Sequence, residues 1–117
     1  MINPRRGEVV LVLFPNSDLR TAKRRPALVL QRDDLGTGLP QTIVAMISSN
    51  LARRGHPSRV FVGVASVEGR AGRLRLDSVI MTDNVATVFE SEIDSVLGRL
   101  PDMAAVDSAL KHTLALI

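Results

Sequence analysis

The pattern of apolar and polar positions along the first two thirds of the chain predicts short β-strands. The run Glu8–Phe14 is dense in valine and leucine, which is typical of a buried strand. Thr42–Ser49 and residues 60–65 alternate between two faces, the period of a pleated strand. Ala27–Gln31 is a further strand, and we expect Pro26 at its first position because proline cannot donate a ladder hydrogen bond.

Two shorter segments, Ser78–Met81 and Ser95–Leu100, predict strands in the second half of the chain. The first of them follows a basic segment that we expect at the tip of a hairpin. Turn-forming residues separate the predicted strands, and we expect no helical crossover between them. This arrangement favours an antiparallel sheet or a small barrel.

At the carboxyl end the apolar period changes to that of a helix. Pro101 and Asp102 suit a first helical turn, whose free N–H groups carry positive partial charge, and Lys111 suits the last turn. The apolar stripe consists of Met103, Val106, Leu110, Leu114 and Ile117. We therefore predict a mainly β fold with one C-terminal α-helix that packs on the sheet.

Length and composition predict a single domain spanning residues 1–117. A chain with 45% hydrophobic residues can bury a real core, and the absence of cysteine excludes disulfides and thiolate zinc sites. The apolar run that follows Arg5 and Arg6 is too short for a signal peptide, and no segment approaches the roughly 20 apolar residues needed to cross a bilayer. We expect a soluble, cytoplasmic protein with no membrane partner.

Charge becomes informative through its type and placement. The net charge is +3, and thirteen of the fifteen cations are arginine, a planar and permanently charged group that binds phosphate through paired hydrogen bonds. They gather at residues 5–6, 20–25, 53–59 and 70–75, which indicates a polyanionic partner. Because the chain has only three aromatic residues, charge and arginine planes would have to replace base stacking on rings.

Few side chains could transfer protons near neutral pH. His56 lies in a polar loop and His112 on the predicted helix, and each is typical of a surface residue. Metal-ligand spacings, phosphate-binding loops and dinucleotide fingerprints do not occur, so we expect no metal and no cofactor. The remaining candidates are Arg25, held by Pro26, and Ser48, at the end of a core strand, although a solvated cation and a plain strand end are the commoner interpretations.

These residues resemble the MazF/PemK toxin family. The likeness begins with Arg6-Gly7-Glu8-Val9, continues in Lys23-Arg24-Arg25-Pro26, and extends through Thr42–Asn50 and Asp77–Asp83 into the terminal helix. The resemblance implies a small, strongly curved antiparallel sheet similar to an SH3-like barrel, a fold shared with CcdB-like toxins. It also implies a homodimeric mRNA interferase that cuts single-stranded RNA without metal, and an acidic antitoxin that fills the RNA groove.

The resemblance also assigns residues. The arginine that precedes proline in the family corresponds to Arg25, the threonine or serine that ends the third strand to Ser48, and an acid that some members use to Asp83. Some relatives carry an arginine two residues before that acid, where this chain has Met81, so the general acid stays unassigned.

The implied chemistry uses the 2′-hydroxyl of the substrate as nucleophile and leaves a 2′,3′-cyclic phosphate and a 5′-hydroxyl. Arg25 would stabilise charge on the phosphate, and Ser48 would donate a hydrogen bond. Asp83 is the remaining candidate for a general base, although nearby arginines would lower its pKa, and capping a turn at residues 82–84 is the alternative role. Contacts to the RNA backbone are expected from Lys23, Arg24, Ser49, Asn50, Arg53 and Arg54.

Two other functions stay open at this point. A toxin of the same fold that binds a protein target such as gyrase would depend on the apolar terminal helix and not on Arg25. A plain nucleic-acid-binding barrel would bind with steep salt dependence and without turnover.

Overall fold

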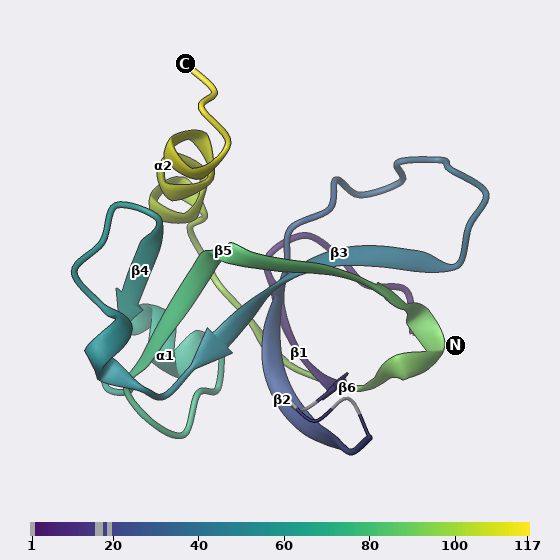
Figure 1. Ribbon diagram of the computed structural model, residues 1–117, viewed down its shortest axis with the longest axis horizontal. Helices are drawn as coiled ribbons and strands as arrows, with labels where there is room; N and C mark the ends of the chain where they lie inside the picture. The colour runs from purple at the N-terminus through teal and green to yellow at the C-terminus, as the bar shows by residue number, and fades with distance from the viewer. Residues whose placement is uncertain (1, 16–17, 19) are drawn as a thin grey trace.

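The computed structural model describes residues 2–15, 18 and 20–117. In this part of the chain, six strands form one antiparallel sheet in the order β4-β5-β3-β2-β1-β6. The strands are β1 (Glu8–Pro15), β2 (Ala22–Val29), β3 (Gln41–Ser48), β4 (Arg59–Val62), β5 (Ser78–Phe89) and β6 (Ile93–Arg99). The α-helices are α1 (Val67–Ala71) and α2 (Ala104–Thr113), and the short 3₁₀ helices are η1 (Leu51–Arg53) and η2 (Glu90–Glu92). Figure 1 shows the strong curvature of the sheet, and the predicted fold class is confirmed.

The curved sheet has an apolar cluster on each face. Val9 and Leu28 belong to one cluster and Val10 and Ala27 to the other, and all four side chains are fully buried. Consecutive strand residues point to opposite faces, so one continuous valine-rich run can supply both clusters. Val106 of α2 completes the first cluster, so the helix closes that face of the sheet near β4 and β5 (Figure 1).

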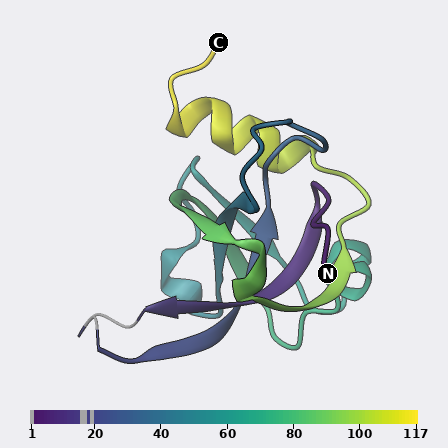
Figure 2. The same cartoon turned by 90° about the vertical axis from the view of Figure 1, so that its right-hand side faces the viewer.

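Strand β2 begins earlier than predicted. It starts at Ala22, and Pro26 pairs with Leu11 of β1 in the middle of the strand. Leu30 donates its N–H to β3. Every second residue of a strand directs its backbone hydrogen-bonding groups to the same neighbour, so Pro26, four residues earlier, also faces β3. The missing donor therefore affects only that side: pairing with β3 starts at Ala27, while pairing with β1 continues outward. Figure 2 shows this part of β1 and β2 projecting from the body.

The segment predicted as one strand over residues 60–65 divides into a strand and a helix cap. Strand β4 ends at Val62, and the carbonyl of Gly63 accepts hydrogen bonds from the N–H and the hydroxyl of Ser66. The Ser66 hydroxyl oxygen in turn accepts from the N–H of Gly69, 3.0 Å away, and caps α1. The predicted basic hairpin tip is thus preceded by a short helix.

Strand β5 is much longer than the predicted Ser78–Met81. Met46 of β3 pairs with Met81, and the next pair joins Ala45 to Val85, so residues 82–84 form a bulge in a strand that continues to Phe89. The polar triplet that favours a turn in the sequence is therefore accommodated by extra residues within a strand.

The terminal helix is shorter than its apolar stripe. It ends at Thr113, and Ala115 has a positive φ of 56°, a left-handed conformation that stops the helix. Val106 is buried, whereas Leu114 and Ile117 are exposed. Neither helix in the described residues is long and apolar enough to cross a membrane.

The end of α1 contacts β6 through two glycines. A Cβ atom at Gly98 would lie 2.2 Å from the carbonyl oxygen of Ala71 and 2.9 Å from the carbonyl carbon of Gly72. Only a residue without a side chain allows this approach. The contact fixes where the chain leaves α1 relative to the sheet.

Gly98→Ala should therefore lower the free energy of unfolding by about 1–3 kcal/mol or more, since the methyl group overlaps backbone atoms that have little room to move. Urea unfolding of the purified protein measures this. Gly63→Ala is the matched control, because its added Cβ would lie no closer than 3.7 Å to Phe61, an ordinary contact. Equal losses in the two variants would contradict the close-packing argument.

Candidate functional site

A groove of about 820 Å³ opens beside the outer part of β2. One wall consists of residues 23–26 of β2, and residues 47–49 at the end of β3 adjoin it. The segment 73–76 also lines the groove, and we call it the basic arm because it carries Arg73 and Arg75. Leu11 of β1 and Leu97 of β6 add apolar surface.

The groove brings together Arg25 and Ser48, the two leading candidates from the sequence. The β2–β3 register pairs Ala27 with Met46, and continuing it by two residues places Arg25 opposite Ser48. Both residues line the groove and are half-buried, and the Nε atom of Arg25 is fully buried. A guanidinium that is partly withdrawn from water interacts more strongly with an anion than an exposed one does.

The groove is strongly positive. Its lining includes the cations Lys23, Arg24, Arg25, Arg73 and Arg75, while none of its described lining residues carries a carboxylate or an imidazole. Arg24 is also 3.3 Å from Asp94, but both side chains are well exposed, so solvent screens this pair. The groove therefore attracts anions through both β2 and the basic arm.

The hydroxyl of Ser48 is positioned by a local hydrogen bond. Its oxygen accepts from the backbone N–H of Asn50 at 3.1 Å, which uses an acceptor site of the hydroxyl and not its proton. Asn50 does not line the groove: its side-chain oxygen accepts from the N–H of Ala52 and caps η1. Ser49 is exposed and lines the groove, as predicted for an RNA contact.

Arg53 and Arg54, also predicted to contact RNA, lie outside the groove. The backbone carbonyl of Arg53 accepts a hydrogen bond from Arg59. The guanidinium of Arg53 lies 3.9 Å from the sulfur of Met81. The guanidinium of Arg54 lies 5.4 Å from the ring centroid of Phe61. These arginines form a separate basic surface at the β4 edge.

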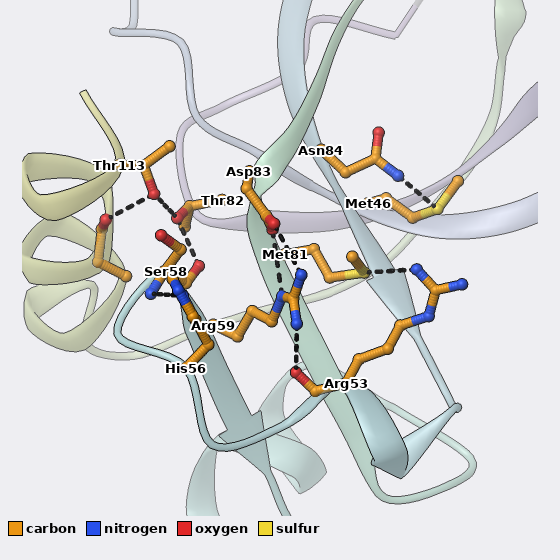
Figure 3. Close-up of polar contacts among 11 residues, drawn as sticks. Met46, Arg53, His56, Ser58, Arg59, Met81, Thr82, Asp83, Asn84 and Thr113 are labelled. Carbon is orange, nitrogen blue, oxygen red and sulfur yellow. Dashed lines mark hydrogen bonds and ion pairs between the residues drawn. The ribbon is translucent and has the colours of Figure 1, made fainter.

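Asp83, the predicted general base, is not brought together with Arg25 and Ser48. It lies in the bulge of β5 and accepts two hydrogen bonds from the guanidinium of Arg59, at 2.9 and 3.4 Å (Figure 3). The Arg59 hydrogen bond lowers the pKa of Asp83, and partial burial opposes that effect. In this position Asp83 secures the bulge through Arg59, which is closer to the alternative role of capping a turn than to that of a general base beside Arg25.

Other side chains around the bulge have structural partners too. The Thr82 hydroxyl donates to the carbonyl of Ser58 and lies 2.7 Å from the hydroxyl of Thr113 on α2 (Figure 3). His56 accepts from the N–H of Ser58 and packs edge to face against His112. Polar groups exposed by the broken ladder are thereby satisfied. Among the described residues, no group of three or more His, Cys, Asp or Glu could hold a metal ion.

The basic arm and β6 also line the groove, and neither was predicted from the sequence. The cation cluster at 70–75 is evident in the sequence. How close it lies to residues 20–25 in the folded chain depends on α1 and on the contact between Gly72 and Gly98. A five-residue helix and a close glycine contact leave little periodic signal in a sequence.

The chain matches a family model over residues 5–114, and that family is described as PemK-like, MazF-like toxin of type II toxin-antitoxin system. The endoribonuclease MazF6 of Mycobacterium tuberculosis is 34% identical over 107 residues, which cover 89% of this chain and 90% of the relative. The endoribonuclease EndoA of Bacillus subtilis is 29% identical over 116 residues, covering 97% and 96%.

Solved structures share the fold over the whole chain. An endoribonuclease in complex with its cognate antitoxin, from a mycobacterial species, superposes with a TM-score of 0.74 at 20% identity, covering 97% of both chains. A MazE–MazF crystal structure from Deinococcus radiodurans gives a TM-score of 0.74 at 21% identity, covering 99% of this chain and 100% of that chain.

The position of Asp83 predicts an effect on stability that depends on pH. Asp83→Asn should lower the free energy of unfolding at neutral pH by about 0.5 kcal/mol, because the pair with Arg59 is partly screened by solvent. The folded-state pKa lies below the ordinary 3.8, so this stability is present above that value and is lost as the pH falls through the folded pKa. Urea unfolding from neutral pH to about pH 3 should show the difference from wild type shrinking.

Glu90→Gln is the control for that experiment, since it removes an equal charge just beyond the end of β5 without touching Arg59. If Asp83→Asn and Glu90→Gln show the same stability at every pH, the pair with Arg59 does not secure the bulge.

Proposed function

The chain belongs to the PemK-like, MazF-like family of type II toxins, and from this premise we propose that it is an endoribonuclease whose active site is the groove between β2 and the basic arm. The observation that carries the proposal is that Arg25 and Ser48, from different strands, line one strongly positive groove. The names of the similar proteins of Mycobacterium and Bacillus support the activity.

The reaction that suits this groove uses the ribose itself as the nucleophile. The 2′-oxygen bonds to the adjacent phosphorus and gives up its proton to water, the bond from phosphorus to the 5′-oxygen breaks, and that oxygen takes up a proton from water. Negative charge accumulates on the non-bridging oxygens during the attack. Arg25 offsets this charge with a guanidinium that strand β2 already holds in position, so little reorganisation accompanies the reaction.

Ser48 has a positioning and donating role in this proposal. Its oxygen already accepts from the N–H of Asn50, which orients the hydroxyl so that its proton can be donated to a phosphate oxygen. A serine hydroxyl is a weak base, and we assign it no proton abstraction.

The proposed mechanism relies on charge and position more than on proton abstraction by the protein. The described lining of the groove contains no carboxylate and no imidazole, and the carboxylate of Asp83 is engaged by Arg59. We therefore give Asp83 a structural role. Lys23, Arg24 and Ser49 retain the proposed role of contacting the RNA backbone, because they line the same groove.

An antitoxin that binds this protein would contact the same five cations of the groove. Similar toxins have been solved in complex with a cognate antitoxin, and a groove lined by five cations suits an acidic peptide segment as well as RNA. We propose that a cognate acidic antitoxin covers this groove, that the toxin acts as a homodimer, and that it acts in the cytoplasm, where its RNA substrate occurs.

Arg25→Ala should lower the cleavage rate at saturating RNA by about 10²–10³-fold, the loss seen when one pre-positioned donor is removed from a transition state. Single-turnover cleavage of a labelled RNA measures this, and urea unfolding checks that the variant folds. Arg32→Gln is the matched control, because Arg32 is an exposed arginine outside the groove. A rate within a few-fold of the wild-type rate would remove Arg25 from the chemistry, whereas a wild-type protein that cuts no RNA would favour a toxin that only binds its target.

A single deoxyribose at the cleaved position should abolish cutting while leaving binding nearly unchanged, since it removes only the attacking hydroxyl. The position is first found by mapping the ends produced from a long RNA, and the substituted oligonucleotide is then compared with the all-ribose one. Continued cutting at the substituted position would exclude the 2′-hydroxyl mechanism.

A further inference from the structure

The basic arm is held rigidly although it is not part of the sheet. Gly72, directly before it, abuts Gly98 of β6, and the Leu74 side chain is buried in the apolar cluster that includes Val9. The N–H of Leu74 donates to the carbonyl of Gly69 at 3.0 Å. Beyond the arm, the carboxylate of Asp77 accepts from a backbone N–H at 2.8 Å. The arm is therefore anchored before, within and after its cations.

This anchoring presents two arginines to the groove. Arg73 and Arg75 flank the buried Leu74, and both line the groove while remaining exposed to solvent. Arg73 adopts a left-handed conformation with a φ of 55°, in which glycine or asparagine would be less strained. Arg73 directly follows the C-cap Gly72 of α1, so this conformation ends the helix and turns the chain into the arm.

Arg25 and the basic arm differ in what they can do. Arg25 lies on β2 beside Ser48, where the proposed chemistry occurs, whereas the arm belongs to a separate element that lines the same groove. An RNA strand in the groove presents several phosphates in succession, and the wall around Arg25 can serve only part of them. Leu11 and Leu97 add apolar surface to the groove. The face of a nucleotide base could pack against these aliphatic side chains in place of an aromatic ring.

We infer that Arg73 and Arg75 form a second phosphate subsite, which binds a backbone phosphate next to the one that is cleaved. This inference rests on the proposed function of the groove and names how its substrate is held. Phosphate contacts of this kind fix the position of a strand and carry no sequence information. The subsite therefore contributes to affinity and KM, whereas Arg25 contributes to the rate of the chemical step.

The test is the salt dependence of RNA binding by the double variant Arg73→Asn/Arg75→Gln. Asparagine tolerates the left-handed backbone of residue 73, so the charges are removed without added strain. The probe is a fluorescent single-stranded RNA in which every 2′-hydroxyl is methylated, so that it cannot be cut at any position, and it is titrated at several salt concentrations. The subsite neutralises one phosphate, so its loss should reduce the slope of log K against log salt by about 0.7.

Between about 50 and about 200 mM salt, the wild type should then lose about 2.6-fold more affinity than the double variant does. The matched control is Arg32→Gln/Arg99→Gln, which removes two exposed arginines that line a different hollow. The control should keep the wild-type slope. In cleavage assays the double variant should raise KM several-fold with kcat nearly unchanged.

The outcomes separate the subsite from the proposed function. If the wild type cleaves RNA and the double variant keeps the wild-type slope, or if the control loses as much slope, the subsite is wrong and the function stands. If the wild type binds RNA without cutting it, and only the double variant loses slope, the subsite stands and the proposed function fails. A wild type that neither binds nor cuts RNA overturns both.

Discussion

The candidate site depends on the point at which β2 separates from β3. Pro26 has no N–H to offer on the side that faces β3, so the ladder between the strands begins only at Ala27. On the other side β2 stays paired to β1, which keeps the separated part extended and ordered. Arg25 is the first residue beyond the separation, and Ser48 is the last residue of β3 opposite it. One missing donor thus opens the groove and places the candidate cation at its edge.

A second constraint positions the basic arm. The glycine contact between the end of α1 and β6 sets the backbone of the basic arm, and the burial of Leu74 fixes it further. Both constraints are steric and lie outside the charged residues. The positive groove is therefore prearranged by backbone and apolar packing, so that the cations need not be drawn together by a ligand against their mutual repulsion.

The sequence predicted what depends on local pattern. The valine-rich run of β1, the alternation of β3 and the terminal helical stripe gave nearly correct elements, and the β2 and β3 motifs correctly suggested that Arg25 and Ser48 lie together. What depends on tertiary contacts was not predicted. Residues 82–84 have turn chemistry but are held in a strand by Ser58, Arg59 and Met46, which are remote in the sequence. The place of the basic arm beside the groove was not predicted for the same reason, because it depends on contacts between residues that are remote in the sequence.

The positive charge of the groove links the proposed activity to its proposed inhibition. The described lining of the groove holds no carboxylate and no imidazole, so the proposed activity relies on its guanidinium and ammonium charges. The proposed inhibition acts by covering these same charges. An acidic segment that competes for the same cations needs no separate regulatory site.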